Sequence, residues 1–442
     1  MLTKLARIAE IAKERPTEKF ISIGHFINKE LLENCHNEAD RHKAKGVDQV
    51  TKDEYGANLE ANLTDLVERL KRHSYRPQPV RRVYIPKAGS TAKRPLGIPA
   101  YEDKLVQAAL SKILNAIYEA EFLNCSYGFR PNRGVHDALK ALGHIIEKRR
   151  VNYIVDADIK GFFDHVNHKW LLKFVQHRIA DPNIYRLIYR FLRAGVMEEG
   201  KKYATAEGTP QGGVVSPILA NIYLHYVVDI WFQKAVRKNL RGEAHMVRYA
   251  DDIVFCFQYE EEAQLFYRAL VERLAKFNLE VSADKTKIIE FGKHAEEQGE
   301  KKGTGTPETF DFLGFTHYCG KSKHGKFRVK RKTSKKKYRA SMLKLKEWVK
   351  TNRHLHIHEL WKQMATKLRG YYQHYGITDN IIMLENFLYE ARKILFKWLN
   401  RRSQRKSFDW GKFNLFLKKF PLPRPKIYVN VYEFRPGLEL PR

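Results

Sequence analysis

The sequence predicts an α+β fold built around an antiparallel sheet. Two runs of β-branched and aromatic residues, 153–159 and 246–257, have the composition of buried strands. Segments with helical spacing of apolar residues, at 168–193, 217–235 and 261–277, alternate with these runs. Strands and helices that interleave in this way favour helices packed on a central sheet.

The N-terminal elements follow from apolar spacing and from prolines and glycines. Apolar residues recur at helical intervals over 5–12 and 59–70, which predicts two helices. Over 76–100, short apolar runs alternate with seven prolines and glycines, which predicts a β-hairpin with a polar tip at 88–93. Helical spacing resumes over 105–117.

The C-terminal part of the chain differs in composition. Residues 292–309 are polar and rich in glycine, and we expect a mobile loop there. The segment 321–350 holds fourteen Lys or Arg and one acidic residue, Glu347, and helical spacing then continues to about residue 400. This change of composition predicts a domain boundary near residue 320.

The charge of the chain indicates its partners. Lys and Arg number 81, against 50 Asp and Glu, a formal excess of +31. Cations gain affinity for polyphosphate by releasing condensed counterions at each contact, so nucleic acid is the first partner to expect. Because 43% of the residues are hydrophobic, the chain can also bury a core, which excludes a disordered polycation.

Zinc sites, disulfide frameworks and membrane spans are not expected. The four cysteines, at positions 35, 125, 256 and 319, form no C-x-x-C pair. No run approaches the roughly 18 uninterrupted apolar residues of a spanning helix, and the N-terminus lacks the apolar segment of a secretory signal. We expect a cytoplasmic protein associated with nucleic acid, with no membrane partner.

Carboxylates mark the predicted chemistry. Asp251 and Asp252 lie at the expected turn between two buried strand arms. Two ionised carboxylates side by side repel each other, and a divalent cation relieves that repulsion. Asp158 ends the other strand run and supplies a third carboxylate, with Asp156 and Asp164 as neighbouring alternatives. Such an oxygen cage suits Mg²⁺, and two Mg²⁺ ions roughly 3.5–4 Å apart support nucleotidyl transfer.

The order of the motifs around these carboxylates resembles a known family. The motifs are Ser-Tyr-Gly-Phe-Arg-Pro (126–131), Asp158 with Phe162 and Phe163, the Pro-Gln-Gly-Gly segment within 208–221, Tyr-Ala-Asp-Asp (249–252), Asp-Lys-Thr (284–286) and Phe-Leu-Gly-Phe (312–315). In this order the chain resembles the reverse transcriptases encoded by group II introns and their bacterial relatives.

The resemblance implies a right-hand polymerase fold. Fingers and palm would surround the antiparallel sheet core, and an α-helical thumb, also used as a maturase domain, would follow. We therefore expect a helical N-terminal extension (1–75), fingers and palm (76–318), a thumb or maturase domain (319–400) and a basic segment similar to a short DNA-binding segment (401–442).

The resemblance also implies which residues act in an RNA-directed DNA polymerase. Asp158, Asp251 and Asp252 match the catalytic triad, which binds two Mg²⁺ ions, with Mn²⁺ as a substitute, and deoxynucleoside triphosphates are the implied substrates. The residues that match nucleotide contacts are Lys87, Arg94, Phe163, Gln211 and Lys285, with Lys93 as an alternative to Lys87 or Arg94. Within this set, Phe163 matches a gate against the ribose 2′-hydroxyl, and Lys285 matches a residue on the pyrophosphate side.

Two further groups match contacts to nucleic acid strands. The template group combines aromatic faces with charge and consists of Tyr127, Phe129, Arg130 and Arg133. The group that matches a primer-gripping hairpin consists of Phe312, Leu313, Gly314 and Phe315. The implied partners are an RNA template, a DNA or RNA primer, group II intron RNA and a DNA target.

Structural alternatives stand beside these roles. Phe163 can be a core aromatic, Lys285 a surface lysine, the cations of the hairpin tip a solvated turn, and the template group a packed aromatic loop. The paired-cysteine endonuclease module of some family members has no counterpart here, so target nicking is not expected.

Alternative functions also stay open beside an intron-encoded polymerase with maturase activity. One is a polymerase of the same type that serves its host in DNA repair or defence. Another is a splicing-only RNA-binding maturase, which the intact carboxylate triad argues against. An RNA-copying RNA polymerase is disfavoured, because such enzymes commonly place an acid where Phe163 stands and a glycine where Ala250 stands.

Overall fold

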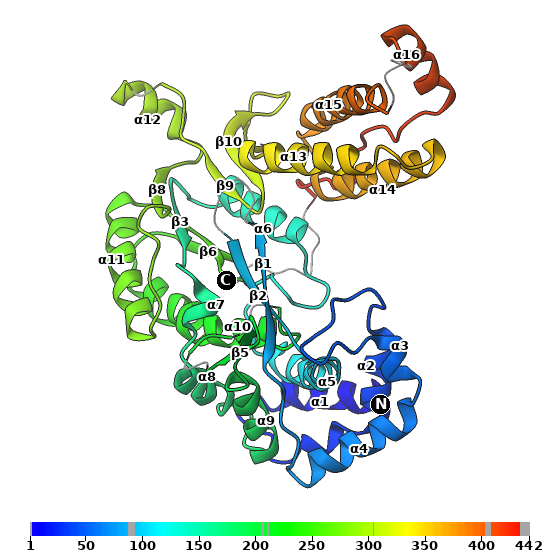
Figure 1. The fold of residues 1–442 in the computed structure, drawn as a ribbon. Helices are drawn as coiled ribbons and strands as arrows, with labels where there is room; N and C mark the ends of the chain where they lie inside the picture. Colours follow the sequence, from blue (N-terminus) through cyan, green and yellow to red (C-terminus); the bar gives the residue numbers. More distant parts are fainter. Residues whose placement is uncertain are drawn as a thin grey trace.

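A four-stranded antiparallel sheet forms the centre of the protein (Figure 1). The computed structural model describes residues 2–86, 93–204, 207–209, 212–303, 305–402 and 408–433. The strands lie in the order β6 (Ala244–Tyr249), β7 (Asp252–Phe257), β3 (Tyr153–Asp158) and β8 (Lys287–Glu290). Both predicted strand runs are confirmed, and the run 246–257 folds as the hairpin β6–β7.

Side chains alternate between the two faces of this sheet, as the two-residue period of a strand requires. Val155 and Phe255 pack on one face, in a core shared with helices of the fingers and palm. Ile154 and Val254 pack on the other face, in a core shared with the C-terminal helices. The helices of the first core include α5 (Tyr101–Tyr118), α8 (His168–Val175), α9 (Pro182–Leu192), α10 (Ser216–Leu224) and α11 (Glu260–Lys276).

Two predicted helices are interrupted. The segment 168–193 divides into α8 and α9, because Asp181 caps a new helix, its Oδ1 accepting a hydrogen bond from the backbone of Asn183 at 2.8 Å, and Pro182 opens that helix. The segment 217–235 begins as α10 but continues as a π-helical stretch, His225–Asp229. Such wide turns are frequent at functional sites.

A second sheet carries the fingers. Its order is β2 (Lys93–Ile98), β1 (Val80–Pro86), β4 (Val196–Glu198) and β5 (Lys201–Tyr203), and the predicted hairpin is β1–β2. Helices of the N-terminal extension, several of which share the first core with α5, lie below this sheet in Figure 1: α1 (Leu2–Glu14), α2 (Lys29–Glu38), α3 (Lys52–Gly56) and α4 (Leu59–Lys71).

The prediction of a loop over 292–309 is wrong in part, because helix α12 (Ala295–Lys302) forms within this segment. Glu296 and Glu297 occupy the first turn and two lysines the last, which matches the helix dipole. Gly303 ends the helix in the left-handed conformation, at φ 70°. Glu296 also pairs with Lys321 at 2.8 Å.

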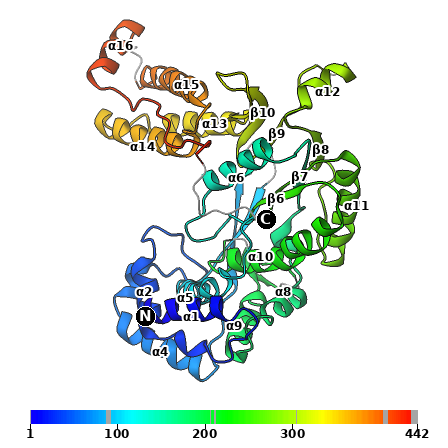
Figure 2. The same ribbon diagram turned by 180° about the vertical axis from the view of Figure 1, so that it is seen from behind.

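The C-terminal part is a small sheet followed by helices. The sheet consists of β9 (Phe310–Phe312), β10 (Phe315–Lys321) and β11 (Phe327–Thr333), and the helices are α13 (Lys335–Asn352), α14 (Ile357–Tyr375), α15 (Ile381–Leu399) and α16 (Trp410–Lys419). Figure 2 shows α6 (Val135–Lys148) between these helices and the central sheet. The boundary predicted after residue 318 falls inside β10, so this strand joins the two expected domains.

The segment 408–433 folds back on the thumb helices. Phe413 and Val431 are buried in the same core as those helices, and the indole of Trp361 donates a hydrogen bond to the carbonyl of Phe420 at 3.0 Å. The predicted α+β class is confirmed. Among the helices that the structure describes, none is long and apolar enough to span a bilayer.

Candidate active site

Three carboxylates meet at one end of the central sheet. Asp158 is the last residue of β3, Asp252 is the first residue of β7, and these two residues are direct partners across the strand pair. Asp251 lies beside them in the two-residue turn between β6 and β7, after Ala250, whose φ of 57° is unusual for a residue with a side chain. The strand register therefore gathers the predicted triad.

The protein around this cluster disfavours its negative charge. Burial, and then the charges of Asp251 and Asp158, raise the pKa of Asp252 to about 6, although its side chain still reaches solvent. Burial and the charge of Asp158 also raise the pKa of Asp251. Asp156 faces the same side, and burial followed by the charges of Asp252 and Asp158 raises its pKa to about 7. A cation bound here would relieve this repulsion.

The cluster contains its own cation, Lys285. Its Nζ lies 2.6 Å from Oδ2 of Asp158, and the turn that carries it is anchored by the backbone of Ser282, which donates to the carbonyl of Asp158 at 2.8 Å. Among the described residues no three acidic, His or Cys side chains already converge as a metal cage. The donors nevertheless suit Mg²⁺ in chemical type and backbone position, and Lys285 would release Asp158 when an ion binds.

A pocket of about 200 Å³ lies between the fingers hairpin and the start of the palm. Phe163 lines it together with Arg82, Pro95, Gly97 and Thr209. The Nε atom of Arg82 is shielded from solvent and has no hydrogen-bond partner among the described residues. Asp164 and Glu207 also line this pocket, so the spare donor of Arg82 is the group in it that can bind an anionic ligand.

The remaining predicted nucleotide contacts have different outcomes. Arg94 is exposed on β2. Its positive charge lowers the pKa of Asp251 and of Asp252, but the effect of burial, which raises both pKa values, is larger. Lys93 is exposed beside Arg94. Lys87 and Gln211 lie outside the described residues. Asp164, the alternative acid, is exposed at the edge of the pocket and does not join the triad.

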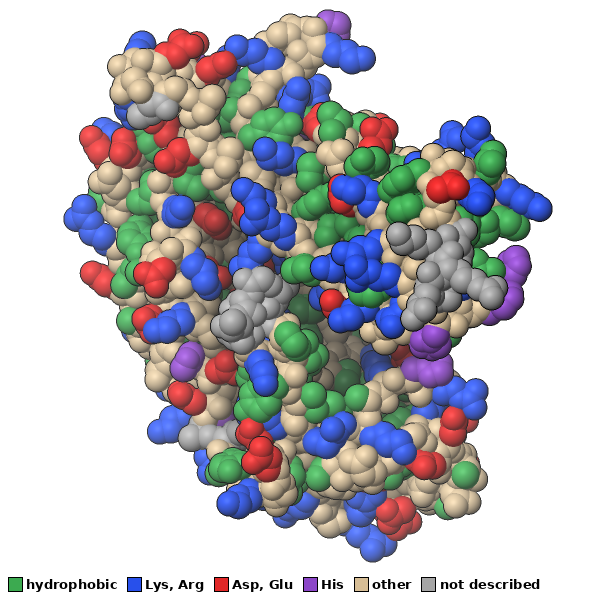
Figure 3. Space-filling view, turned by 45° about the horizontal axis from the view of Figure 1, so that its top comes forward, with side chains coloured by type: hydrophobic (Ala, Val, Ile, Leu, Met, Phe, Trp, Pro, Cys, Tyr) green, Lys and Arg blue, Asp and Glu red, His purple; other side chains and the backbone are tan. Residues whose placement is uncertain are grey.

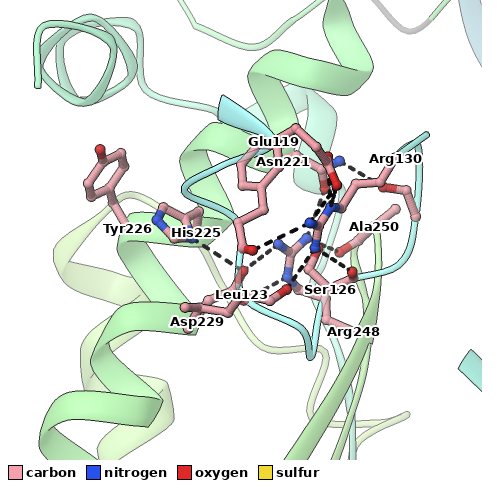
Figure 4. Close-up of polar contacts among 12 residues, drawn as sticks. Glu119, Leu123, Ser126, Arg130, Asn221, His225, Tyr226, Asp229, Arg248 and Ala250 are labelled. Atoms are coloured by element: carbon pink, nitrogen blue, oxygen red, sulfur yellow. Dashed lines mark hydrogen bonds and ion pairs between the residues drawn. The ribbon is translucent and has the colours of Figure 1, made fainter. Parts of the chain in front are cut away.

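A buried set of hydrogen bonds supports the turn that carries Asp251 (Figure 4). Arg248 on β6 bonds to both carboxylate oxygens of Asp229, at 2.7 and 2.5 Å, and both side chains are fully buried. The same guanidinium donates to Oδ1 of Asn221 at 3.0 Å and to the carbonyl of Ala250 at 3.1 Å. Asn221 in turn donates to the carbonyl of Gly128 at 2.7 Å.

Sequence reasoning assigned no role to Arg248, Asp229 or Gly128, although a signal existed. Arg248 interrupts a buried strand run and Asp229 interrupts the most apolar helix, and charged residues in such places are usually paired. Gly128 is a close-approach glycine, because a Cβ atom built on it would lie 2.4 Å from the backbone nitrogen of Ala250. These residues therefore fix the turn from behind.

The predicted template group lies in the loop that packs against this turn. Tyr127 and Arg130 are buried, and Arg130 bonds to both carboxylate oxygens of Glu119 and to backbone carbonyls (Figure 4). Arg133 is half-buried and bonds to Asn124 at 2.7 Å. Phe129 is 51% exposed. For Tyr127 and Arg130 the observed contacts are those of a packed aromatic loop, and Phe129 is the member that faces solvent.

The predicted primer-gripping hairpin is the turn between β9 and β10. Phe312 and Phe315 are buried in the thumb core and anchor it. Leu313 and Gly314 form the turn with φ values of 51° and 89°. The backbone of Ser334 donates to the carbonyl of Gly314 at 3.0 Å, which ties the turn to the start of α13.

The thumb presents its cations to solvent. The exposed Lys and Arg side chains of α13 are Lys335, Lys336, Lys337, Arg339, Lys344, Lys346 and Lys350. Lys337 is close enough to the catalytic end of the sheet for its charge to oppose the rise in the pKa of Asp252. Figure 3 shows a hollow in the middle of the molecule, with Lys and Arg side chains on the surfaces that border it.

Comparison with known proteins shows which families and proteins the sequence resembles. The profile of the family described as "Reverse transcriptase (RNA-dependent DNA polymerase)" matches residues 85–317. Group II intron-encoded protein LtrA of Lactococcus lactis is 38% identical over 222 residues, which cover 50% of this chain and 37% of LtrA. Protein YkfC of Escherichia coli is 34% identical over 316 residues, which cover 64% of this chain and 78% of YkfC.

Among solved structures, telomerase from Candida albicans, in a complex with a fragment of telomeric RNA, has a TM-score of 0.44 and 12% identity. The match covers 83% of this chain and 65% of the telomerase chain. The chain spans well under half the length of LtrA.

Proposed function

The chain belongs to the reverse transcriptase family, and from this premise we propose that it is an RNA-directed DNA polymerase that extends a primer on an RNA template. The observation that carries the proposal is the register of Asp158 opposite Asp252, with Asp251 in the adjoining turn. Carboxylates from two neighbouring strands and their turn can hold metal ions for transfer of a nucleotide to a 3′-hydroxyl.

The chemistry divides between bound cations and the side chains around them. Two divalent ions would activate the attacking hydroxyl and stabilise the leaving pyrophosphate. Asp158, Asp251 and Asp252 would hold these ions. The 3′-hydroxyl of the primer would lose its proton to water as its oxygen forms a bond to the α-phosphorus, and the bond from that phosphorus to the pyrophosphate oxygen would break. Lys285, which contacts Asp158 at 2.6 Å, would donate a proton to the pyrophosphate once an ion replaces it on that carboxylate.

The pocket that Phe163 lines would hold the incoming deoxynucleoside triphosphate. Arg82 has a spare buried donor for a phosphate oxygen, and Arg94 offers an exposed guanidinium on the adjacent strand. The ring of Phe163 lines the same pocket, where it would exclude a ribose 2′-hydroxyl. Lys87 and Gln211 stay predictions for the same ligand.

The rest of the chain would bind the strands. Phe129 offers an exposed ring for stacking on the template, and the turn at Leu313 and Gly314 would contact the primer. The exposed cations of α13 are placed to contact the phosphates of the duplex. The division into extension, fingers and palm, thumb and basic segment is part of this proposal, as is action on nucleic acid in the cytoplasm.

A second function is favoured by the same row of cations and by the relatives. Seven Lys and Arg side chains of α13 are exposed, and LtrA is named as a group II intron-encoded protein. We infer that the chain also binds structured intron RNA through its thumb and supports splicing, with a DNA target for mobility. If the chain binds no intron RNA in a binding assay, a host role in repair or defence is the alternative.

Primer extension tests the polymerase proposal. An RNA template with a DNA primer, Mg²⁺ and deoxynucleotides is supplied to the wild type and to the Asp251→Asn/Asp252→Asn variant. We expect extension by the wild type and none by the variant, with RNA binding within about twofold, because affinity comes from the cationic surfaces. Asp53→Asn/Asp65→Asn removes the same charge from N-terminal helices and should extend normally.

Two outcomes would contradict the proposal. Equal extension by the Asp251→Asn/Asp252→Asn variant would remove the carboxylates from the chemistry. A folded wild type that binds RNA but extends no primer would favour the splicing-only alternative, and an intron-splicing assay would then test the second function.

A further inference from the structure

A second cavity lies in the N-terminal extension, away from the carboxylates. Its volume is about 510 Å³, within the range of roughly 300–1,000 Å³ that small-molecule sites occupy. The segment before α2, helix α4 and helix α9 form its walls. Figure 1 shows α4 and α9 below the central sheet. The cavity shares no lining residue with the proposed nucleotide pocket, so the two are separate.

The cavity combines an apolar wall with positive charge. Its apolar side chains are Ile27, Val67, Leu70, Tyr75, Ile184 and Leu187. Four permanent cations and two histidines line it as well: Lys29, Lys71, Arg186, Arg190, His25 and His73. Among the described residues that line it there is no Asp or Glu. A site of this composition attracts a ligand that is both apolar and negatively charged.

The cations differ in how they are paired. Lys29 forms an ion pair with Glu60, and Arg190 donates to the backbone carbonyls of Tyr75 and His73 at 2.7 and 2.9 Å. Arg186 differs from these, because its Nη1 atom is shielded from solvent and has no hydrogen-bond partner in the part of the chain that the structure describes. A buried donor without an acceptor is costly, and a ligand oxygen would remove that cost.

The charges in this cavity also repel one another. Burial, and then the positive charges of Arg76 and Arg186, lower the pKa of Arg190. Lys29 is neutralised by Glu60. Lys71, Arg186 and Arg190 form no ion pair with a carboxylate of any described residue, and cations held together in this way favour the binding of an anion.

We propose that this cavity binds a small organic anion, with a phosphate, carboxylate or sulfonate head on Arg186 and Lys71 and an apolar body against Leu70, Ile184 and Leu187. The volume accommodates the aromatic base of a mononucleotide or the chain of a medium-length fatty acid. Both carry the same chemistry, a charged head on an apolar body. Since α4 and α9 both contact the ligand, binding would fix the extension against the palm.

Fluorescence of 8-anilinonaphthalene-1-sulfonate, a sulfonate on an aromatic body, tests the proposal with the full chain. We expect one saturable site in the wild type and binding at least about tenfold weaker in Lys71→Gln/Arg186→Gln, which removes two charged hydrogen-bond donors. Leu70→Trp fills the apolar wall without changing charge and should also abolish the site. Circular dichroism checks that each variant is folded. If Lys71→Gln/Arg186→Gln does not fold, binding of the probe to Leu70→Trp tests the proposal instead.

A matched control removes two cations from the ends of the same helices. Arg72 and Arg193 are the C-caps of α4 and α9 and do not line the cavity. Arg72→Gln/Arg193→Gln should keep wild-type affinity for the probe. Equal weakening in this control, or no saturable binding by the wild type, would overturn the proposal, because binding would then reflect general surface charge or be absent.

Competition identifies the source of the ligand. Displacement of the probe by adenosine monophosphate supports a nucleotide, and displacement by decanoate supports a fatty acid. Decanol has the same body as decanoate without its charge and should displace the probe at least about tenfold less well. Equal displacement by decanol would overturn the role of the cations. Primer extension is measured in parallel and should be unchanged in all of these variants, so failure here is distinct from failure of the polymerase proposal.

Discussion

The guanidinium of Arg248 and the carboxylate of Asp229 form a two-bond ion pair in the interior of the palm, at 2.7 and 2.5 Å. The pair joins strand β6, which leads into the catalytic turn, to the π-helical stretch that follows α10. A third donor of the same guanidinium bonds to the carbonyl of Ala250, next to Asp251. A buried charge pair thus supports the turn that carries Asp251, one of the proposed catalytic carboxylates.

Arg248→Lys should lower kcat without an equal effect on nucleotide binding. Lysine can keep a charge on Asp229 but cannot also reach Ala250 with a planar fork. We expect kcat for primer extension to fall about 100-fold, as a displacement near 1 Å of a catalytic group costs. The KM for deoxynucleotides should stay within about threefold, because Phe163 and Arg94 are untouched.

Arg331→Lys is the matched control for this prediction. Arg331 is also fully buried, but it bonds to the carbonyls of Leu139 and Val329 in the thumb region. Both variants should lower the melting temperature, while kcat measured well below that temperature should fall only in Arg248→Lys. Similar kcat values for the two variants would reduce the Arg248 ion pair to a purely structural role.

Phe163→Ala should relax the choice of sugar. The ring lines the proposed nucleotide pocket, and its removal would open room for a 2′-hydroxyl. We expect the ratio of ribonucleotide to deoxynucleotide incorporation to rise by about tenfold or more, the range that a steric contact of this size gives. Tyr189→Ala removes an exposed aromatic ring elsewhere and should leave the ratio unchanged. An unchanged ratio in Phe163→Ala would remove the gate.

His225 should make the protein sensitive to mild acid. Its ring is buried against Phe122 and Tyr226, and neither ring nitrogen has a hydrogen-bond partner among the described residues, although Nδ1 lies 3.9 Å from Oδ2 of Asp229. Burial lowers its pKa to about 4 against the opposing charge of Asp229. In the unfolded chain this histidine has an ordinary pKa near 6.5 and takes up a proton below that pH. In the folded chain it stays neutral until the pH approaches 4. Stability from this group is therefore complete above about pH 6.5 and declines as the pH falls toward 4, by at most about 3 kcal/mol.

Urea unfolding between pH 7.5 and 5 measures this effect. His225→Phe keeps a ring in the same packing and removes the titration, so its free energy of unfolding should fall less than that of the wild type. The other titrating groups are common to both proteins and cancel in the difference. Parallel pH curves for the two proteins would show that His225 does not titrate on unfolding.

The positions of the three proposed catalytic carboxylates were predictable because two local rules place them. A two-residue turn between apolar runs sets Asp251 and Asp252 at a hairpin, and the period of β3 sets Asp158 at its end. Burial of Tyr127 and Arg130 was not predictable in this way. Their loop packs behind a turn that lies more than a hundred residues later, and only the folded chain brings the two together.

Other differences had a local signal that was weaker than the periodicity around it. Asp181 and Pro182 are a helix start within an otherwise helical pattern, and the acidic first turn and basic last turn of α12 outweigh its low hydrophobicity. The cavity beside Arg186 has no signal in sequence, since its walls come from three separate segments.

Gly128→Ala should disable the active site through a single added carbon. A Cβ atom at this position would lie 2.4 Å from the backbone nitrogen of Ala250 and 3.0 Å from the carbonyl carbon of Tyr249, distances that require one backbone to move. The side chain of Asn221 holds the loop by a hydrogen bond to the carbonyl of Gly128, so we expect the hairpin turn that carries Asp251 to shift instead. Primer extension should fall about 100-fold, with stability lower by about 1–3 kcal/mol.

Gly370→Ala adds the same methyl group as Gly128→Ala, but it should raise stability and leave primer extension normal. Gly370 lies within α14 with no atom inside 4 Å of an added Cβ, so alanine there should raise the free energy of unfolding by about 1 kcal/mol through helix propensity. Thermal melting and primer extension on both variants make the comparison. Normal extension by Gly128→Ala would mean that the loop moves away freely and that the turn is positioned by Arg248 alone.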